Sequence, residues 1–302
     1  MKFSMKPHFN FFAVLSLGFL GLSGLQAADQ ATHPDFSSYW HAGLAEITHY
    51  DLEQFRYNEI HAGTATLIFV TEPFSTTKQV KLDNYNSPDK VNVLKLNYTK
   101  NFNTGVYPYQ VMTSSFAPET GGTAIKVTTT IQEWCGHVFS QINQTKKGYD
   151  YQLYSYFESE GDQSKSLGKS LPEESLWTQV RINPQALPVG MFDMYPSQEV
   201  TRFRHWDYQS IKAVGDLTPH LEDDNLMTYT IMHELPAKRS LSLHFSKIPP
   251  YEIVAWEENY YYLQQGKEVP ITTKATKKKM VRWPYWQMNS NKDRVKLKEL
   301  IN

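Results

Sequence analysis

The stretch VNVLKLNYTK, from Val91 to Lys100, is followed five residues later by VYPYQVMTSSF, from Val106 to Phe116. Both are rich in β-branched and aromatic residues, and their apolar positions largely alternate with polar ones. Alternation with a period of two puts every second side chain on the same face of a strand. A connection this short suits a hairpin and is too short for a helical crossover. The two stretches therefore predict neighbouring antiparallel strands.

The same composition recurs along the chain, which has 302 residues with 19 tyrosines and 16 phenylalanines. Clusters of turn-forming residues such as NYNSPDK, APETGG and NQTKKG separate the candidate strands. The sequence therefore predicts a mainly β fold, a large antiparallel sheet that is curved or closed into a half-barrel. Further strands are expected at residues 63–72, 123–134, 149–157, 239–248 and 251–263.

One short helix is expected, in the stretch LPEESLWTQVRINP at residues 171–184. Pro172 suits a first helical position, acidic residues follow it, and Pro184 ends the pattern. Leu176, Trp177 and Val180 form an apolar stripe, which predicts packing against the sheet.

The first 27 residues have the layout of a secretory signal peptide, with Lys2 and Lys6 before an uncharged apolar run and Ala27 at the expected cleavage point. We therefore expect an exported protein of the periplasm or cell envelope. Removal of residues 1–27 changes the formal net charge from −1 to −3, because it removes two lysines and no acid. Residues 28–270 are expected to form a β-rich domain with a possible seam near 183–225, followed by a basic aromatic tail at 271–302.

Composition and motifs exclude several classes of function. The slightly acidic mature chain does not suit a nucleic-acid partner. Cys135 is the only cysteine, so no intramolecular disulfide can form. The histidines near the mature N-terminus lack a recognised ligand spacing, and no phosphate-binding or metalloprotease motif occurs. We expect no metal and no cofactor.

A family resemblance rests on YWHAGLAEITHYDLEQFRYNEIHAGTATLIFVTE, VLKLNYTKNFNTGVYPYQVMTSSF, IQEWCGHVFSQIN, YFESEGDQ and RINPQALPVG. These stretches, which cover roughly residues 39–204, resemble a family of exported bacterial proteins that often carries the label septum formation inhibitor Maf. The resemblance implies an envelope protein without an established activity. The chain lacks the serine-x-arginine-arginine start of genuine Maf pyrophosphatases, so the label implies no nucleotide chemistry here.

The aromatic supply favours a non-catalytic domain that binds an apolar ligand, a glycan or a protein partner on its curved sheet. Stacking surfaces are expected from six aromatic residues: Trp40, Tyr107, Tyr109, Trp134, Tyr154 and Tyr156. A continuous apolar groove would indicate ligand binding, whereas a filled interior would indicate a structural role. The stretch KATKKKMVRWPYWQM, at residues 274–288, has the composition of a membrane-surface segment or of a solvated basic tail.

The alternative is an enzyme, a hydrolase of a cell-envelope polymer, and it rests on IQEWCGHVF at residues 131–139. If the strand alternation continues without a slip, Glu133, Cys135 and His137 share one face. Residues 142 and 149 are taken to close the next hairpin. Glu133 then lies opposite Glu158, Cys135 opposite Tyr156, and His137 opposite Tyr154.

Opposed carboxylates repel, so Glu133 and Glu158 should share a proton, a cation or His137, with Glu160 and Asp162 nearby. The functional hypothesis is an acid/base or metal site formed by Glu133, Cys135, His137 and Glu158. The structural alternative is a hydrogen-bonded polar patch at the sheet rim, or a bulge at Gly136 that turns His137 away. A one-residue slip in register would dissolve the cluster.

Overall fold

The fold is one large sheet, described by a computed structural model over residues 36–264 and 267–301. The predicted signal peptide lies outside the described residues. The sheet has 15 strands in the order β8-β7-β6-β5-β4-β3-β2-β1-β15-β14-β13-β12-β11-β10-β9. In chain order these are β1 (Ala45–Arg56), β2 (Glu59–Ser75), β3 (Lys90–Thr104), β4 (Tyr107–Pro118), β5 (Lys126–Glu133), β6 (Gly136–Gln144), β7 (Tyr149–Tyr154), β8 (Gln163–Leu167), β9 (Leu171–Pro172), β10 (Gly190–Tyr195), β11 (Ile211–Pro219), β12 (Leu226–His233), β13 (Arg239–Ser246), β14 (Ile253–Gln264) and β15 (Lys267–Trp283).

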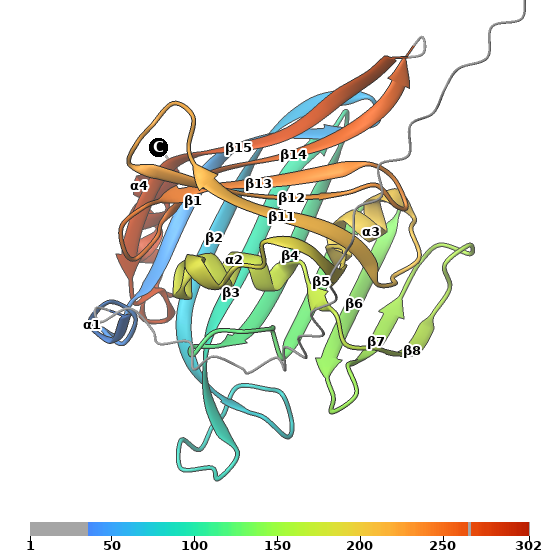
Figure 1. The fold of residues 1–302 in the computed structure, drawn as a ribbon. Coiled ribbons are helices and arrows are strands. Elements are labelled where there is room, and N and C mark those ends of the chain that lie inside the picture. Colours follow the sequence, from blue (N-terminus) through green and yellow to red (C-terminus); the bar gives the residue numbers. More distant parts are fainter. Residues whose placement is uncertain (1–35, 265–266, 302) are drawn as a thin grey trace, which may run out of the picture.

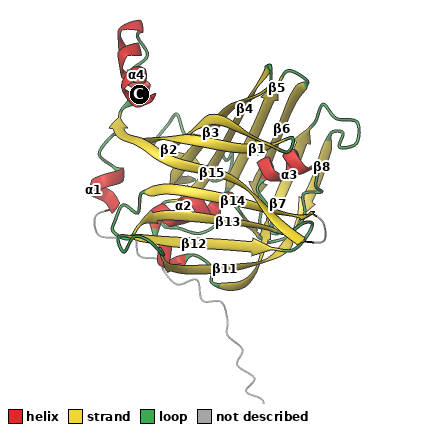
Figure 2. Ribbon diagram, turned by 90° about the horizontal axis from the view of Figure 1, so that it is seen from above, coloured by secondary structure: helices red, strands yellow, loops and turns green. Residues whose placement is uncertain are grey.

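The sheet consists of two meanders that meet at β1 and β15. We call β1–β8 the first wing and β9–β15 the second wing. Neighbouring strands pair antiparallel throughout, except for the short parallel pair β9 and β10. The sheet curves so that both wings lie around one helix (Figures 1 and 2). The predicted mainly β fold with a large curved antiparallel sheet is confirmed.

The helices are few and short. They are α1 (Phe36–Trp40), α2 (Glu174–Ile182), α3 (Gln198–Arg204) and α4 (Arg294–Ile301), with 3-10 turns at Pro184–Ala186, Tyr285–Gln287 and Asn291–Asp293. None of the helices in the described part of the chain is long and apolar enough to cross a membrane.

The predicted helix at 171–184 forms as α2 and lies inside the curve of the sheet. It ends at Ile182, and the extended backbone of Asn183 then leads into Pro184. Trp177 packs on Tyr98 of the first wing, at 5.1 Å between ring centroids, and on Trp256 of the second wing, at 5.2 Å. Every residue of α2 is buried, including its polar residues. The helix therefore fills the concave side of the sheet instead of covering an open face.

The predicted C-terminal tail begins inside a strand, because residues 271–283 belong to β15 at the centre of the sheet. β15 pairs with β1 on one side and with β14 on the other. Two of its lysines pair with acids: Lys277 contacts Glu252 at 2.9 Å, and Lys274 lies 3.6 Å from Glu257. A basic run can thus occupy a central strand when acids lie beside it. Contact of residues 274–288 with a membrane surface stays a prediction.

Candidate functional site

The predicted cluster in IQEWCGHVF lies at a hairpin turn and not along one strand. Glu133 ends β5, Gly136 begins β6, and these two residues pair, so Trp134 and Cys135 form the turn. His137 pairs with Gln132 and therefore shares its face, which is opposite to the face of Glu133. The prediction that Glu133, Cys135 and His137 share one face of a continuous strand is wrong, because the chain reverses between them.

The expected partners across the next hairpin are also different. Ile142 pairs with Tyr151, and the β6–β7 ladder ends where Phe139 pairs with Tyr154. The register therefore differs by two residues from the predicted one. Each side chain keeps its predicted face of the sheet, but it lies opposite a different residue of the neighbouring strand. Glu158 lies beyond the ladder, in the exposed connection between β7 and β8. The predicted pairs of Glu133 with Glu158, Cys135 with Tyr156, and His137 with Tyr154 do not form.

Glu133 instead stabilises its own turn. Its carboxylate accepts a hydrogen bond from the backbone N–H of Cys135 at 2.7 Å. The thiol of Cys135 is exposed, and its interaction with Glu133 raises the pKa of the thiol above its usual range. A catalytic cysteine needs the opposite shift, because the thiolate is the nucleophile.

The six predicted binding aromatics separate into two groups. Trp40 and Tyr109 are buried in the main core, at 2% exposure each. Trp134, Tyr154 and Tyr156 are exposed at 71%, 52% and 63%. Tyr107 is half-buried, and its ring stacks on Trp134 with 6.4 Å between centroids. The three exposed rings and Tyr107 all lie on strands and connections of the first wing.

A polar pocket lies beside α3, on the inner face of the first wing. We call it the α3 pocket; its volume is about 260 Å³. It is lined by Ser140, Tyr151, Leu153, Ser159, Glu160, Gln163, Gln198, Thr201, Arg202, His205, Trp206, Asp207 and Tyr208.

A group of polar contacts around Glu160 forms one side of the α3 pocket. The Nδ1 atom of His205 lies 2.6 Å from Oε1 of Glu160, and Arg202 lies 3.7 Å from the same oxygen. The other oxygen of Glu160 accepts a hydrogen bond from Ser155 at 2.5 Å. His205 ends α3 in the left-handed conformation, with φ of 54°, a strained geometry for a residue with a side chain. The imidazole is thus fixed against a carboxylate at the pocket wall.

Three buried groups in the α3 pocket have unused hydrogen-bonding capacity. Gln198 is 2% exposed; its carbonyl accepts from Ser140 at 2.5 Å, whereas its Nε2 has no partner. The hydroxyl of Tyr208, which is 3% exposed, and Nε of Arg202 likewise have no partner within the described residues. Buried polar groups are nearly always hydrogen-bonded, so three neighbouring exceptions indicate a place for a polar ligand.

Two stacked tyrosines, Tyr151 and Tyr208, form the apolar part of the same pocket. Tyr208 stacks on Tyr151 at 4.6 Å between centroids and on Tyr195 at 5.4 Å. Tyr208 is thereby held between strands β7 and β10. The aromatic surface continues towards the rim, because Phe157 lies 4.0 Å from the guanidinium of Arg202 and 5.3 Å from the ring of Tyr156.

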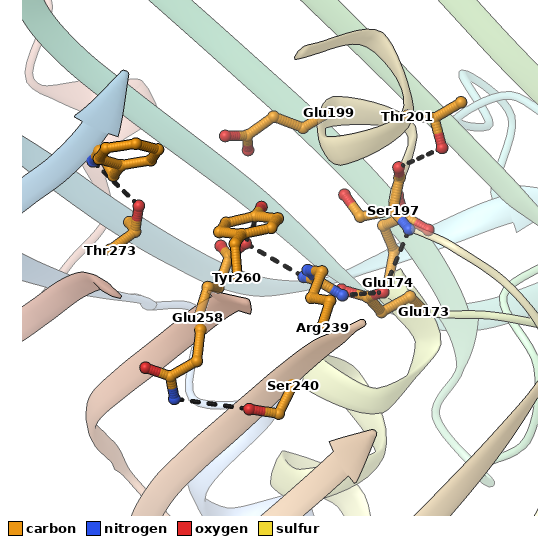
Figure 3. Close-up of polar contacts among 12 residues, drawn as sticks. Glu173, Glu174, Ser197, Glu199, Thr201, Arg239, Ser240, Glu258, Tyr260 and Thr273 are labelled. Carbon is orange, nitrogen blue, oxygen red and sulfur yellow. Dashed lines mark hydrogen bonds and ion pairs between the residues drawn. The ribbon is translucent and has the colours of Figure 1, made fainter. Parts of the chain in front are cut away.

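A buried network of charges connects α2 and α3 with the strands of the sheet, and Figure 3 shows the part of it around Arg239. Arg239 on β13 donates to both oxygens of Glu173 at 2.8 Å and to Glu258 at 3.1 Å. Lys100 on β3 donates to Glu199 of α3 at 2.8 Å and to Glu258 at 3.4 Å. The network therefore links both wings to both helices. Burial alone raises the pKa of Glu258, but the charges of Lys100 and Arg239 outweigh it and lower the pKa to about 2.

Glu174 connects this network to the α3 pocket. Its Oε1 accepts a hydrogen bond from the backbone N–H of Gln198 at 2.8 Å, while Oε2 has no partner among the residues described. Burial raises the pKa of Glu174 to about 8, and the nearby charge of Glu173 adds to the shift. At neutral pH this side chain is therefore mostly a protonated, uncharged acid.

Most residues of the α3 pocket are absent from the sequence prediction. Of the pocket residues, the sequence pattern predicts only Glu160 near the expected cluster. The histidine that contacts Glu160 is His205, not His137. The one available signal is the stretch TRFRHWDY at residues 201–208, which combines arginine, histidine, aspartate and aromatic residues. No group of three or more His, Cys, Asp or Glu residues in the described ranges could hold a metal ion.

Comparisons with known proteins give a distant structural likeness. No protein-family model and no curated protein matches the chain, so neither supports the septum formation inhibitor Maf label. Among solved structures, the chain is similar to a β-barrel-like protein of the domain of unknown function DUF1849 from Brucella abortus. The two share 8% sequence identity with a TM-score of 0.45, over 80% of this chain and 98% of that chain.

Proposed function

We propose that this chain is a non-catalytic, exported binding protein of the cell envelope, whose α3 pocket holds one sugar unit of a glycan. The observation that carries the proposal is the set of unpartnered buried groups on Gln198, Arg202 and Tyr208, next to a wall of stacked tyrosines. An apolar ligand inside the sheet is disfavoured, because α2 and the main core fill the concave side.

A sugar matches the chemistry of the α3 pocket for two reasons. Its hydroxyls both donate and accept, so they can satisfy the N–H groups of Gln198 and Arg202 as well as the carboxylate of Asp207. The apolar face of a sugar ring also suits an aromatic wall. A volume of about 260 Å³ is small for a ligand site and fits one ring of an oligosaccharide.

The rim beside the α3 pocket can hold further sugar units. Tyr156 is exposed and its ring lies 5.3 Å from that of Phe157, and Trp134 is exposed in the β5–β6 turn. The ring of Tyr156 packs against Gly136 so closely that a Cβ there would lie 2.4 Å from it. The β5–β6 turn, which carries Trp134, and the β7–β8 connection, which carries Tyr156, are thus fixed to each other.

Calorimetric titration of the purified protein with glucose, galactose, mannose, N-acetylglucosamine and their tetramers tests the proposal. We expect millimolar binding of one monosaccharide and tighter binding of its tetramer. Tyr208→Phe should weaken binding about 2- to 10-fold, because it removes a net hydrogen bond of about 0.5 to 1.5 kcal/mol. Tyr195→Phe is the matched control, since its hydroxyl donates to Gly168 at 2.9 Å, outside the pocket lining. Absence of binding by every sugar up to about 50 mM would contradict the proposal.

The second candidate is a glycan hydrolase that uses Glu160 and His205. It is favoured by the 2.6 Å contact between them and by Asp207 in the same pocket. However, Ser155 and His205 already contact the two oxygens of Glu160. This favours a role of Glu160 in sugar binding over a role in proton transfer. Release of reducing ends from a bound tetramer, lost in Glu160→Gln, would select the hydrolase.

A further inference from the structure

A second pocket lies beside α1, at the end of α2 opposite to the side of α3, and has no role in the proposed glycan site. We call it the α1 pocket; its volume is about 270 Å³. Its apolar wall includes Phe36, Tyr39 and Trp40 of α1, together with Pro250 and Tyr251 from the turn between β13 and β14. Arg181 and Arg282 supply its charged groups.

The charge of Arg181 is already balanced. Its two terminal nitrogens contact both oxygens of Glu46, and its Nε donates to the carbonyl of Pro250 at 2.9 Å. Tyr39 also donates to Glu46, at 2.5 Å. Arg181 and Glu46 therefore form a neutral unit, and Arg181 brings no uncompensated charge to the pocket.

Arg282 has no such partner. It lies opposite Glu46 in the β1–β15 pair, but both oxygens of Glu46 are occupied, and no ion pair of Arg282 forms within residues 36–264 and 267–301. Its guanidinium stacks on the ring of Tyr39 at 3.9 Å and donates one hydrogen bond to the carbonyl of the same residue. Its Nε is buried and unpartnered among the described residues. The α1 pocket thus carries one net positive charge with an unused buried donor.

We propose that the α1 pocket binds a small amphipathic carboxylate, an aryl or short alkyl acid of about a dozen non-hydrogen atoms. The carboxylate lies on Arg282, whose planar guanidinium is suited to two parallel hydrogen bonds with a carboxylate. The apolar body lies against Trp40, Pro250 and Tyr251. Arg282 is held in place before binding by Tyr39, which reduces the entropy lost when the ligand binds.

Titrations with 4-phenylbutyrate and octanoate test this site, followed by calorimetry and by the fluorescence of the protein, since Trp40 lines the pocket. The matched neutral probe is 4-phenylbutan-1-ol. We expect the carboxylate to bind at least about 10-fold more tightly than the alcohol, because hydrogen bonds between two charged groups are stronger than those of a neutral hydroxyl. The two acids separate an aryl from an acyl preference. Equal affinity of acid and alcohol, or no binding of either acid up to about 10 mM, overturns the proposal.

Variants on β15 assign the effect to one side chain. Arg282→Gln should weaken the carboxylate about 10-fold and leave the alcohol unchanged. Lys274→Gln makes the same charge change on the same strand, outside the pocket, and should change neither affinity. If Arg282→Gln does not fold, Arg282→Lys replaces it. This variant keeps the charge but loses the planar contacts, so the affinity for the acid should fall several-fold. Unchanged acid binding in the variant that folds overturns the proposal. Tyr208→Phe should not affect binding of the acid in the α1 pocket. The test of the α1 pocket is therefore independent of the test of the glycan site.

Discussion

Arg181 on α2 binds both carboxylate oxygens of Glu46 on β1, although 135 residues separate them in the chain. The Arg181 side chain is 1% exposed and that of Glu46 is 0% exposed. This contact fixes the end of α2 to the strand at which the two wings meet. A fully buried ion pair adds little to stability over an apolar replacement, but neither partner can be lost alone, because the other charge is then buried without a partner.

Arg181→Met and Glu46→Gln should therefore each lower the free energy of unfolding by about 3 to 5 kcal/mol. The double variant Arg181→Met with Glu46→Leu should recover much of this loss, because it leaves no unpaired charge. Unfolding in guanidinium chloride, followed by tryptophan fluorescence, measures the difference. The exposed pair of Lys296 and Glu299 is the control: Lys296→Gln should cost less than about 1 kcal/mol. A single loss at Arg181 no larger than that of the control would contradict the prediction.

The raised pKa of Glu174 predicts a stability that falls as pH rises. The pKa is about 8 in the folded protein, against an ordinary value of 4.5. Between these values the folded state holds a proton that the unfolded chain has lost, so the free energy of unfolding decreases as pH rises. Glu174→Gln replaces the protonated acid with a neutral amide. Relative to the native protein, the variant should gain up to about 1.4 kcal/mol per pH unit within this window.

Glu258 is the control for the pH experiment, because its pKa is lowered to about 2 by Lys100 and Arg239 despite its burial. Its contribution to stability is present above the ordinary value of 4.5 and is lost as pH falls towards 2. Glu258→Gln should therefore be destabilised at neutral pH, with a deficit that shrinks below pH 4.5. A Glu174→Gln variant whose relative stability did not change between pH 5 and 8 would show that Glu174 is ionised in the folded state.

Local pattern predicted the first wing better than the second. The alternation around residues 91–116 predicted β3 and β4, and the capping signals at 171–184 predicted α2. The turn at Trp134 and Cys135 is not predicted by local pattern, because neither position has a proline, an asparagine or a glycine. β15 is not predicted either, because four of its residues from Lys274 to Lys279 are lysines, a pattern typical of a solvated tail. The structure shows that Glu252 and Glu257 lie beside two of these lysines.

The candidate site could not be predicted from local pattern at all. Glu160 and His205 are 45 residues apart, on a strand connection and at the end of a helix, and they meet only because the curved sheet brings α3 against β6 and β7. Gln198 and Tyr208 carry no motif. Their importance follows from burial without a partner, a property of the packed structure and not of the residue type.

Gly63 marks a close approach of strands that a larger residue should disrupt. It lies on β2 between Leu52 of β1 and Phe102 of β3. A Cβ at this position would lie 2.5 Å from the carbonyl oxygen of Asn101 and 2.7 Å from Cβ of Phe102. Gly63→Ala should lower the free energy of unfolding by about 1 to 3 kcal/mol through overpacking. Gly168 is the matched control, since a Cβ there meets nothing within 4 Å, and Gly168→Ala should be nearly neutral in the same assay.

The last prediction concerns the reactivity of Cys135, the exposed thiol at the β5–β6 turn. The interaction with Glu133 raises the pKa of the thiol, so less of the reactive thiolate is present at a given pH. Glu133→Gln removes the negative charge and keeps a side-chain oxygen that can accept from the Cys135 N–H. The variant should therefore react faster with iodoacetamide at pH 7.5, and its rate should reach half of its maximum at a lower pH. Glu158→Gln makes the same charge change in the β7–β8 connection, where no contact with Cys135 forms among the described residues, and should leave the rate unchanged. If both variants react at the native rate, Glu133 does not control the thiol; if Glu158→Gln alone accelerates it, the carboxylate beside the thiol is that of Glu158.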